Sequence, residues 1–309
     1  MGVSRPHAQS RVPEALCAGP FTQVSDTLPS RRSAVATLWK LYRVRDWLHF
    51  LPLPLAGWTA SGDGVPALLG GVVGWACGLA YTAAINQAFD DRLDRANIGK
   101  NPVGGTLGRR EAVLLSIPPA VAMLGIVLWL SPAGLVTASI LLVVATLYSA
   151  PPRLKRIPGL ATLWNVAIGL PGLFFAGTPQ IAEGPVRLLV GLFAILLFVS
   201  QLIHEAKDRD DDQAGGIPTI ATLGGIPGAL GAAAVVLLVL PVFTWWLANG
   251  FALRATLTAA SALFAAGWVV ALTLRIARGD EANLRATRLR YRHTSLALGA
   301  LAFLATLLG

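Results

Sequence analysis

VRLLVGLFAILLFVSQLIHEAKDRDDD, residues 186–212, is an apolar run that ends abruptly in a cluster of charged side chains. Its first part, residues 186–203, contains one charged residue, Arg187. An apolar stretch of about 18 residues is long enough to cross the hydrocarbon core of a bilayer as a helix. We therefore predict a transmembrane helix here, with the charged residues 204–212 at or beyond the membrane surface.

The composition of the whole chain agrees with this reading. Of 309 residues, 54% are hydrophobic and 13% are charged, whereas a soluble domain carries about 25% charged residues. This excludes an ordinary soluble enzyme, a disordered protein and a coiled coil. We predict an all-α, polytopic membrane protein with nine transmembrane helices. The apolar runs lie at residues 47–60, 67–85, 112–130, 133–149, 159–177, 186–203, 226–248, 254–274 and 294–308.

The charged residues predict the orientation of these helices. Nine crossings place the N-terminal tail and the loops that carry most of the charge on one side of the membrane. Of the 25 Lys and Arg, all except Arg187 and Arg254 fall on that side. Because positive loops face the cytoplasm, we expect a multi-pass membrane protein, in the inner membrane if the source is bacterial, with its N-terminus and its active site cytoplasmic. The net charge of +9 then requires no nucleic acid partner.

Residues 1–34 are polar and lack an apolar core of the length that a cleaved signal peptide needs. We expect a disordered cytoplasmic tail here, followed by one membrane domain over residues 35–309. Within that domain, the glycines Gly70, Gly74 and Gly78 repeat every four residues, a spacing that permits close helix packing.

The first acidic cluster reads NQAFDDRLD over residues 86–94. Asn86, Asp90 and Asp94 are four residues apart and so share one helical face. A continuous helix over residues 67–94 would be about 42 Å long at about 1.5 Å per residue, against a hydrocarbon core of about 30 Å. The acidic side chains are therefore expected at the membrane surface.

The second acidic cluster repeats this spacing with Asp208 and Asp212, and His204 lies one turn earlier. Four crossings separate the two clusters, so both return to the same side. Facing carboxylates repel one another unless a cation lies between them, and Mg²⁺ prefers one or two carboxylates together with substrate phosphates. The alternative for either cluster is a solvated acidic loop.

Basic residues lie beside both clusters. The four that we predict to bind an anionic substrate are Arg153, Lys155, Lys207 and Arg209. Cations next to metal-binding carboxylates are what a diphosphate leaving group needs, although membrane orientation explains each charge equally well. A further basic segment, with Arg285, Arg288, Arg290 and Arg292, is expected to anchor the chain and to contact anionic lipid.

These motifs resemble the UbiA superfamily of intramembrane prenyltransferases, which includes 4-hydroxybenzoate polyprenyltransferase and chlorophyll synthase. The family pattern is Asn-Asp-x-x-Asp-x-x-x-Asp after helix 2 and Asp-x-x-x-Asp after helix 6. Asn86, Asp90 and Asp94 match the first motif, and Asp208 and Asp212 match the second. Gln87 replaces the first aspartate of the family pattern, and Asn101 stands where the family has an arginine. The link from Tyr148 to Arg156 and the segment GGIPTIATLGG at 215–225 are also similar to family segments.

The resemblance implies a helical bundle around a central chamber, capped by cytoplasmic loops. It implies an Mg²⁺-dependent prenyltransferase that moves a prenyl group from a polyprenyl diphosphate to a hydrophobic acceptor, an aromatic or quinone precursor, within the membrane. Tyr148 and Asn86 would then contact substrate. The residues implied to ligate Mg²⁺ are Asn86, Asp90, Asp94, Asp208 and Asp212, and the four aspartates among them would be catalytic.

Several other side chains have two interpretations each. Aromatic faces attract positive charge, so an allylic cation could be sheltered by aromatic side chains that could equally be packing residues. These candidates are Phe89, Trp164, Phe174, Phe175 and Phe198. His204 and Glu205 are expected to support the metal-binding carboxylates, and the alternative is that they orient the acceptor or take its proton.

Two other functions are open at this point. A polyprenyl-phosphate phosphoribosyltransferase of the same superfamily would use the same Mg²⁺ chemistry. A secondary transporter also carries intramembrane carboxylates, but its sites usually lie near the midplane on broken helices. The aspartates here follow the ends of apolar runs, which favours the transferase. The sequence does not identify the acceptor, the prenyl chain length or the oligomeric state.

Overall fold

The computed structural model describes residues 31–47, 50–61, 64–90, 101–130, 132–157, 159–176, 184–279 and 283–308. These residues form helices joined by short connections, and apart from one isolated bridge they contain no β-structure. The predicted all-α class is thereby confirmed. The predicted tail falls almost entirely outside the described residues, as does Asp94.

The helices follow the apolar runs of the sequence. They are α1 (Arg31–Leu41), α2 (Val44–Trp47), α3 (Pro52–Ser61), α4 (Val65–Phe89), α5 (Arg109–Leu130), α6 (Pro132–Ser149), η3 (Leu154–Arg156), α7 (Leu160–Gly169), η4 (Leu170–Phe174), α8 (Gly184–Ala214), α9 (Ile220–Leu247), α10 (Arg254–Arg278) and α11 (Leu284–Leu308). Each predicted span coincides with a helix, the span at 159–177 with α7 and η4 together.

Five of these helices, α4, α5, α8, α9 and α10, are long and apolar enough to cross a membrane. The fold is therefore that of a multi-pass membrane protein. The apolar helices at Gly134–Ser149 and Leu160–Phe174 are shorter. Helix α3 has 10 residues, which extend about 15 Å at about 1.5 Å each, half of the hydrocarbon thickness.

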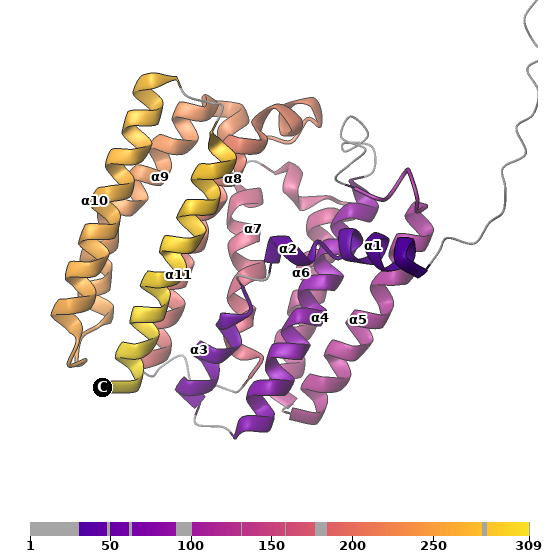
Figure 1. The fold of residues 1–309 in the computed structure, drawn as a ribbon, viewed down its shortest axis with the longest axis horizontal. Helices are drawn as coiled ribbons and strands as arrows, with labels where there is room; N and C mark the ends of the chain where they lie inside the picture. The colour runs from indigo at the N-terminus through magenta and orange to yellow at the C-terminus, as the bar shows by residue number, and fades with distance from the viewer. Residues whose placement is uncertain are drawn as a thin grey trace, which may run out of the picture.

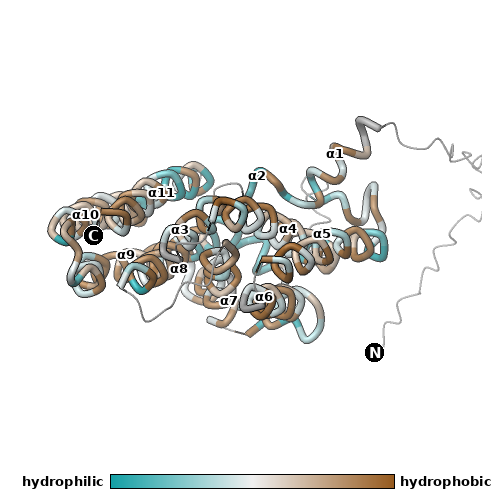
Figure 2. Tube along the Cα trace, turned by 90° about the horizontal axis from the view of Figure 1, so that it is seen from below, coloured by the Kyte–Doolittle hydropathy of each residue, from teal (hydrophilic) through white to brown (hydrophobic). Residues whose placement is uncertain are grey.

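The bundle has two halves. Helices α4, α5 and α6 pack against one another on one side, and α8, α9, α10 and α11 pack on the other. Helices α3 and α7 lie between them (Figure 1), since α3 contacts α4, α8 and α11, and α7 contacts α6 and α8. Viewed from below, the helices are mostly apolar along their length (Figure 2). The short helices α1 and α2 cross in front of this bundle (Figure 1).

The core is centred on Trp75 of α4, which is fully buried. Its indole Nε1 donates to the Phe50 carbonyl at 3.0 Å, and its ring lies 5.2 Å from that of Phe175. The predicted close packing at the α4 glycines is confirmed. A Cβ at Gly70 would meet Leu130 of α5, and one at Gly78 would meet Leu141 of α6 and Met123 of α5.

Gly71 offers a test of this packing. A Cβ there would overlap the backbone and Cβ of Ala176, and backbone atoms cannot rotate away. We expect Gly71→Ala to destabilise the bundle by about 1–3 kcal/mol, the usual cost of overpacking, and to lower the melting temperature of the detergent-purified protein. The control is Gly267→Ala, because a Cβ at that helical, exposed position meets nothing within 4 Å. Equal melting temperatures for the two variants would contradict the packing described.

Candidate active site

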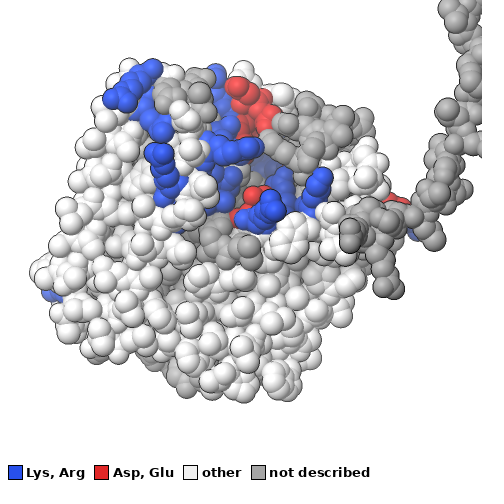
Figure 3. All heavy atoms as spheres, in the orientation of Figure 1, with Lys and Arg blue, Asp and Glu red and all other residues white. Residues whose placement is uncertain are grey.

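A cavity of about 1130 Å³ lies at the end of the bundle where α4, α6 and α8 end and α11 begins. Its wall combines both predicted acidic clusters with basic residues from α1, α2, η3 and α11. Figure 3 shows Lys, Arg, Asp and Glu gathered around a hollow in the upper half of this face, while the lower half is almost entirely uncharged. The charge asymmetry read from the sequence therefore exists in three dimensions.

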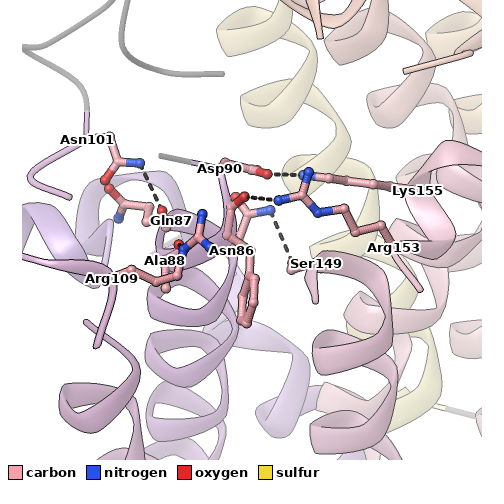
Figure 4. Close-up of polar contacts among 10 residues, drawn as sticks. Asn86, Gln87, Ala88, Asp90, Asn101, Arg109, Ser149, Arg153 and Lys155 are labelled. Carbon is pink, nitrogen blue, oxygen red and sulfur yellow. Dashed lines mark hydrogen bonds and ion pairs between the residues drawn. The ribbon is translucent and has the colours of Figure 1, made fainter. Parts of the chain in front are cut away.

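The first acidic cluster enters the cavity from the end of α4. Asp90, the residue after α4, forms an ion pair with Lys155 of η3, and both side chains line the cavity. Asn86, one turn earlier, donates from Nδ2 to Ser149 Oγ at 3.3 Å (Figure 4). The Lys155 ammonium also lies 5.8 Å from the ring centre of Tyr148. Four predicted site residues thus meet on one wall.

Two arginines hold the end of α4 in place. Arg153 donates from its guanidinium to the Phe89 carbonyl at 2.6 Å, and Arg109 donates from Nε to the Ala88 carbonyl at 3.0 Å (Figure 4). The last carbonyls of a helix lack partners within the helix, and these bonds supply them. Arg153 has a φ of 60°, a left-handed conformation that costs a residue with a Cβ about 1–2 kcal/mol. Arg153 does not line the cavity.

Gln87 points away from the cavity. It is fully buried, and its amide nitrogen donates to the carbonyl of Lys40 at 2.9 Å and also to that of Leu41, both at the end of α1. Asn101 donates from Nδ2 to the Gln87 carbonyl at 3.1 Å and accepts from Val103 N at 2.9 Å. Both residues that depart from the family pattern therefore hydrogen-bond to the backbone. Gln87 connects α4 to the end of α1, and Asn101 connects the segment after α4 back to α4.

The second acidic cluster occupies the last turns of α8, past its apolar run. Asp208 Oδ2 lies 2.7 Å from His204 Nδ1, and Asp208 forms an ion pair with Lys207. Asp212 also lines the cavity. Burial, followed by the negative charges of Asp208 and Glu205, raises the pKa of Asp212 to about 7. Like charges crowded in this way are stabilised when a cation joins them.

Arg209 and Asp210 of the second cluster face elsewhere, whereas Lys207 and Asp211 line the cavity. Arg209 does not line the cavity, and its Nη1 lies 3.6 Å from Oδ1 of the exposed Asp210. A helix turns by about 100° per residue, so Arg209 cannot share the face that Asp208 and Asp212 share. Of the four cations predicted to bind an anionic substrate, the structure therefore places Lys155 and Lys207 in the cavity wall, and not Arg153 or Arg209.

Glu205 has a structural role. It is buried, and it accepts from Thr162 Oγ1 of α7, from Gln201 Nε2 at 3.4 Å and from Ile220 N at 3.1 Å. Ile220 begins α9, whose N-cap Thr219 accepts from Thr222 N at 3.1 Å. One carboxylate therefore ties α7 and α9 to the end of α8, directly beneath the second cluster.

The predicted metal ligands that line the cavity are the amide of Asn86 and the carboxylates of Asp90, Asp208 and Asp212. Within the described ranges, no three His, Cys, Asp or Glu side chains are close enough to hold a metal ion by themselves. Mg²⁺ commonly takes one or two protein carboxylates and completes its ligands with substrate phosphates. Asp94 lies outside the described residues.

The aromatic predictions fit the structure less well. Phe89, Phe174, Phe175 and Phe198 do not line the cavity, and Phe175 packs against Trp75 in the core. The side chain of Trp164 lies outside the described residues. Instead, the aromatic residues of the cavity wall are Trp39, Trp47, Phe50 and Tyr148. The sequence reasoning missed the first three, and the only signal was the mixed aromatic and basic run at 39–47.

Comparison with known proteins agrees with this arrangement. A model of the UbiA prenyltransferase family matches residues 50–306. The chain belongs to this family. A UbiA homologue from Archaeoglobus fulgidus, solved with DMAPP and Mg²⁺, superposes with a TM-score of 0.69 at 18% identity, over 86% of this chain and 99% of that one. The fold is thus shared almost throughout.

Two curated plant relatives are similar over shorter stretches. A 2-acylphloroglucinol 4-prenyltransferase of Humulus lupulus is 32% identical over 46% of this chain and 38% of its own length. A probable homogentisate phytyltransferase 2 of Oryza sativa subsp. japonica is 28% identical over 50% of this chain and 44% of its own length. The chain therefore spans less than half the length of the curated relatives that it matches.

Gln87 gives a test of how this UbiA protein uses its departure from the family motif. Gln87→Asp would restore the family residue but would place a carboxylate against two carbonyl oxygens. We expect it to cost about 1–3 kcal/mol, the penalty for leaving buried polar groups unpaired, and to speed tryptic cleavage near Lys40 and Arg43. The control Gln213→Glu makes a similar change at an exposed site. Unchanged melting and cleavage for Gln87→Asp would contradict the structural role.

Proposed function

We propose that this protein is an Mg²⁺-dependent prenyltransferase that transfers a prenyl group from a polyprenyl diphosphate to an aromatic or quinone-precursor acceptor within the membrane. The observation that carries the proposal is the meeting of Asp90, Asp208 and Asp212 with Lys155 and Lys207 on the wall of one cavity. The Archaeoglobus homologue bound to DMAPP and Mg²⁺, and another bound to GPP and Mg²⁺, support it, as do the plant prenyltransferases.

The residues present fit Mg²⁺. All the predicted ligands are carboxylate or amide oxygens, which hard cations prefer. Burial, and after it the neighbouring carboxylates, raises the pKa of Asp212. In this proposal Asn86, Asp90 and Asp94 hold one side of the metal site and Asp208 and Asp212 the other. The metal supplies charge neutralisation on the departing diphosphate.

The protein side chains then act on the diphosphate directly. Lys155 and Lys207, each paired with an aspartate in the structure, offer ammonium groups to the phosphate oxygens as negative charge develops on them. Tyr148 keeps its ring beside Lys155. Loss of the diphosphate leaves an allylic cation, the acceptor carbon attacks it, and the acceptor ring then loses a proton.

Deeper in the cavity the wall becomes apolar. Leu79 and Ala83 of α4, Ile168 of α7 and Leu197 of α8 line it, and all belong to the apolar runs of these helices. A prenyl chain bound there would bury its methylene and methyl groups, at about 0.8 kcal/mol for each buried CH₂. The cavity therefore joins a charged mouth to an apolar interior, as a prenyl diphosphate requires.

The proposal includes nine membrane crossings with the cavity mouth on the cytoplasmic side. The support is that the ends of α4, α6 and α8 and the start of α11, which the nine-crossing topology assigns to one side, line one cavity. The positive excess on that side favours the cytoplasm. Labelling of single cysteines in closed vesicles with an impermeant reagent would test this orientation.

The catalytic role of the aspartates has a direct test. We expect Asp90→Asn and Asp208→Asn to lower Mg²⁺-dependent diphosphate release from labelled prenyl diphosphates by at least about 100-fold, because one preorganised electrostatic partner contributes on that order. Asp210→Asn is the matched control, since its side chain is 89% exposed and lies outside the cavity wall. Full activity of Asp208→Asn would count against the shared metal site.

Metal binding can be measured without turnover. We expect Mg²⁺ and inorganic pyrophosphate together to raise the melting temperature of the purified protein, because a ligand that binds the folded state stabilises it. Neither ligand alone should do so to the same extent, since the described residues offer no complete metal site. Asp212→Asn should abolish the shared effect, and Asp210→Asn should preserve it. An equal rise in melting temperature with pyrophosphate alone would show that the Lys and Arg of the cavity bind pyrophosphate without Mg²⁺, which would contradict the shared metal site.

A further inference from the structure

Three of the four arginines in the segment 285–292 line the cavity, namely Arg285, Arg288 and Arg292. Arg285 is exposed, whereas Arg288 and Arg292 are half-buried, which lipid anchoring does not explain. Arg288 and Arg292 are one turn apart on α11, and both line the cavity. Arg290, between them, is exposed and lies outside the cavity wall. The same segment therefore carries an inward arginine pair and, between its members, an arginine on another face.

This pair stands on a different wall from the first acidic cluster. Helix α11 packs against α8, α10 and α3, whereas Asp90 and Lys155 come from the end of α4 and from η3. Arg292 reaches toward the α1–α2 segment and donates from Nη1 to the Asp46 carbonyl at 3.4 Å. Asp208, in the last turns of α8, lies within electrostatic reach of Arg288.

The pair keeps unused hydrogen-bonding capacity. The Nε atoms of Arg288 and Arg292 are buried and have no hydrogen-bond partner, a costly state for a charged donor. Burial, followed by the positive charge of Arg292, lowers the pKa of Arg288 to about 9, although the negative charges of Asp208 and Asp46 act in the opposite direction. Two guanidinium groups held together in this way are stabilised when an anion joins them.

The charges around the cavity leave room for a second anion. The side chains that line it include eight Lys and Arg and six Asp and Glu. The proposed donor site already uses Lys155, Lys207 and three of the acids, and bound Mg²⁺ would add further positive charge. A diphosphate alone therefore leaves the α11 wall with a positive excess.

We propose that Arg288 and Arg292 form a second anion subsite, which binds the carboxylate of an acidic aromatic acceptor. The inference rests on the proposed function and specifies its acceptor class. A guanidinium fork matches a planar carboxylate in two parallel hydrogen bonds. A carboxylate bound on α11 would be held by a different element from the Asp90–Lys155 pair, inside the same cavity.

Binding of small probes to the full-length protein in detergent tests this subsite. The probes are 4-hydroxyphenylacetate and its neutral primary amide, titrated without Mg²⁺ or donor and followed by calorimetry. We expect the acid to bind about tenfold tighter than the amide, the value of one charge-assisted hydrogen bond. Arg288→Gln and Arg292→Gln should each remove this preference, and Arg290→Gln, the matched control, should retain it.

Three results would overturn the inference. They are equal affinity of the wild type for acid and amide, an equal loss of preference in Arg290→Gln, and displacement of the acid by phosphatidylglycerol, which would assign the pair to lipid. Binding of pyrophosphate in the presence of Mg²⁺ provides the remaining check, and we expect Arg288→Gln and Arg292→Gln to retain it. If these variants lose as much affinity for pyrophosphate as for the acid probe, the arginine pair belongs to the site of the prenyl diphosphate.

The proposed function is tested separately in the same preparations by measuring diphosphate release. If the protein releases diphosphate from a labelled prenyl diphosphate in an Mg²⁺-dependent way but shows no preference for the acid, only the subsite is contradicted. If it releases diphosphate from none of the prenyl diphosphates tried, the proposed prenyltransferase function is contradicted. Melting temperatures of the three variants show whether each is folded.

Discussion

Neutralisation of carboxylates at the end of a membrane bundle is the constraint on which the rest of this structure depends. A lone carboxylate near a low-dielectric medium is expensive unless a cation or hydrogen-bond donors satisfy it. Asp90 is satisfied by Lys155, Asp208 by Lys207 and His204, and Glu205 by donors from α7, α8 and α9. These pairings fix how the ends of α4 and α8 meet the connection from α6 to α7. The Asp90–Lys155 pair ties the end of α4 to η3, and Glu205 ties α8 to α7, which lies between the two halves of the bundle.

This constraint explains which features the sequence could predict. Hydrophobic run length depends only on neighbouring residues, so the nine apolar runs located all the main helices. The spacing of Asp208 and Asp212 is equally local, because residues four apart share a helical face. Counting crossings predicted that both acidic clusters return to the same side of the membrane, and the family resemblance implied a shared chamber. Asp90, Asp208 and Asp212 do line one cavity. Asp94 lies outside the described residues, and its part in the site stays a prediction.

The features that sequence reasoning missed depend on contacts between distant residues. Nothing near Gln87 indicates that its amide bonds the end of α1, 46 and 47 residues earlier in the chain. Arg153 was expected to bind substrate, but it caps α4 across 64 residues of sequence. The aromatic candidates were chosen for their residue type, yet Phe175 is needed in the core beside Trp75. Residue type and local spacing cannot decide between such roles, because the partner is set by the packing of helices.

The basic residues show how positive charge can serve both membrane orientation and anion binding. Positive charge on the cytoplasmic side orients a membrane protein whether the charged residues are exposed or buried. Membrane orientation therefore does not explain why Arg288 and Arg292 lie inside a cavity. Burying guanidinium groups costs free energy, and exposed lysines or arginines, such as Arg290, would orient the chain without that cost. Their inward placement therefore needs a further cause, and an anion between them would offset the repulsion of the two charges. A cavity that holds a diphosphate on one wall and a second anion on another would keep these two negative groups apart while the allylic carbon reacts with the acceptor ring.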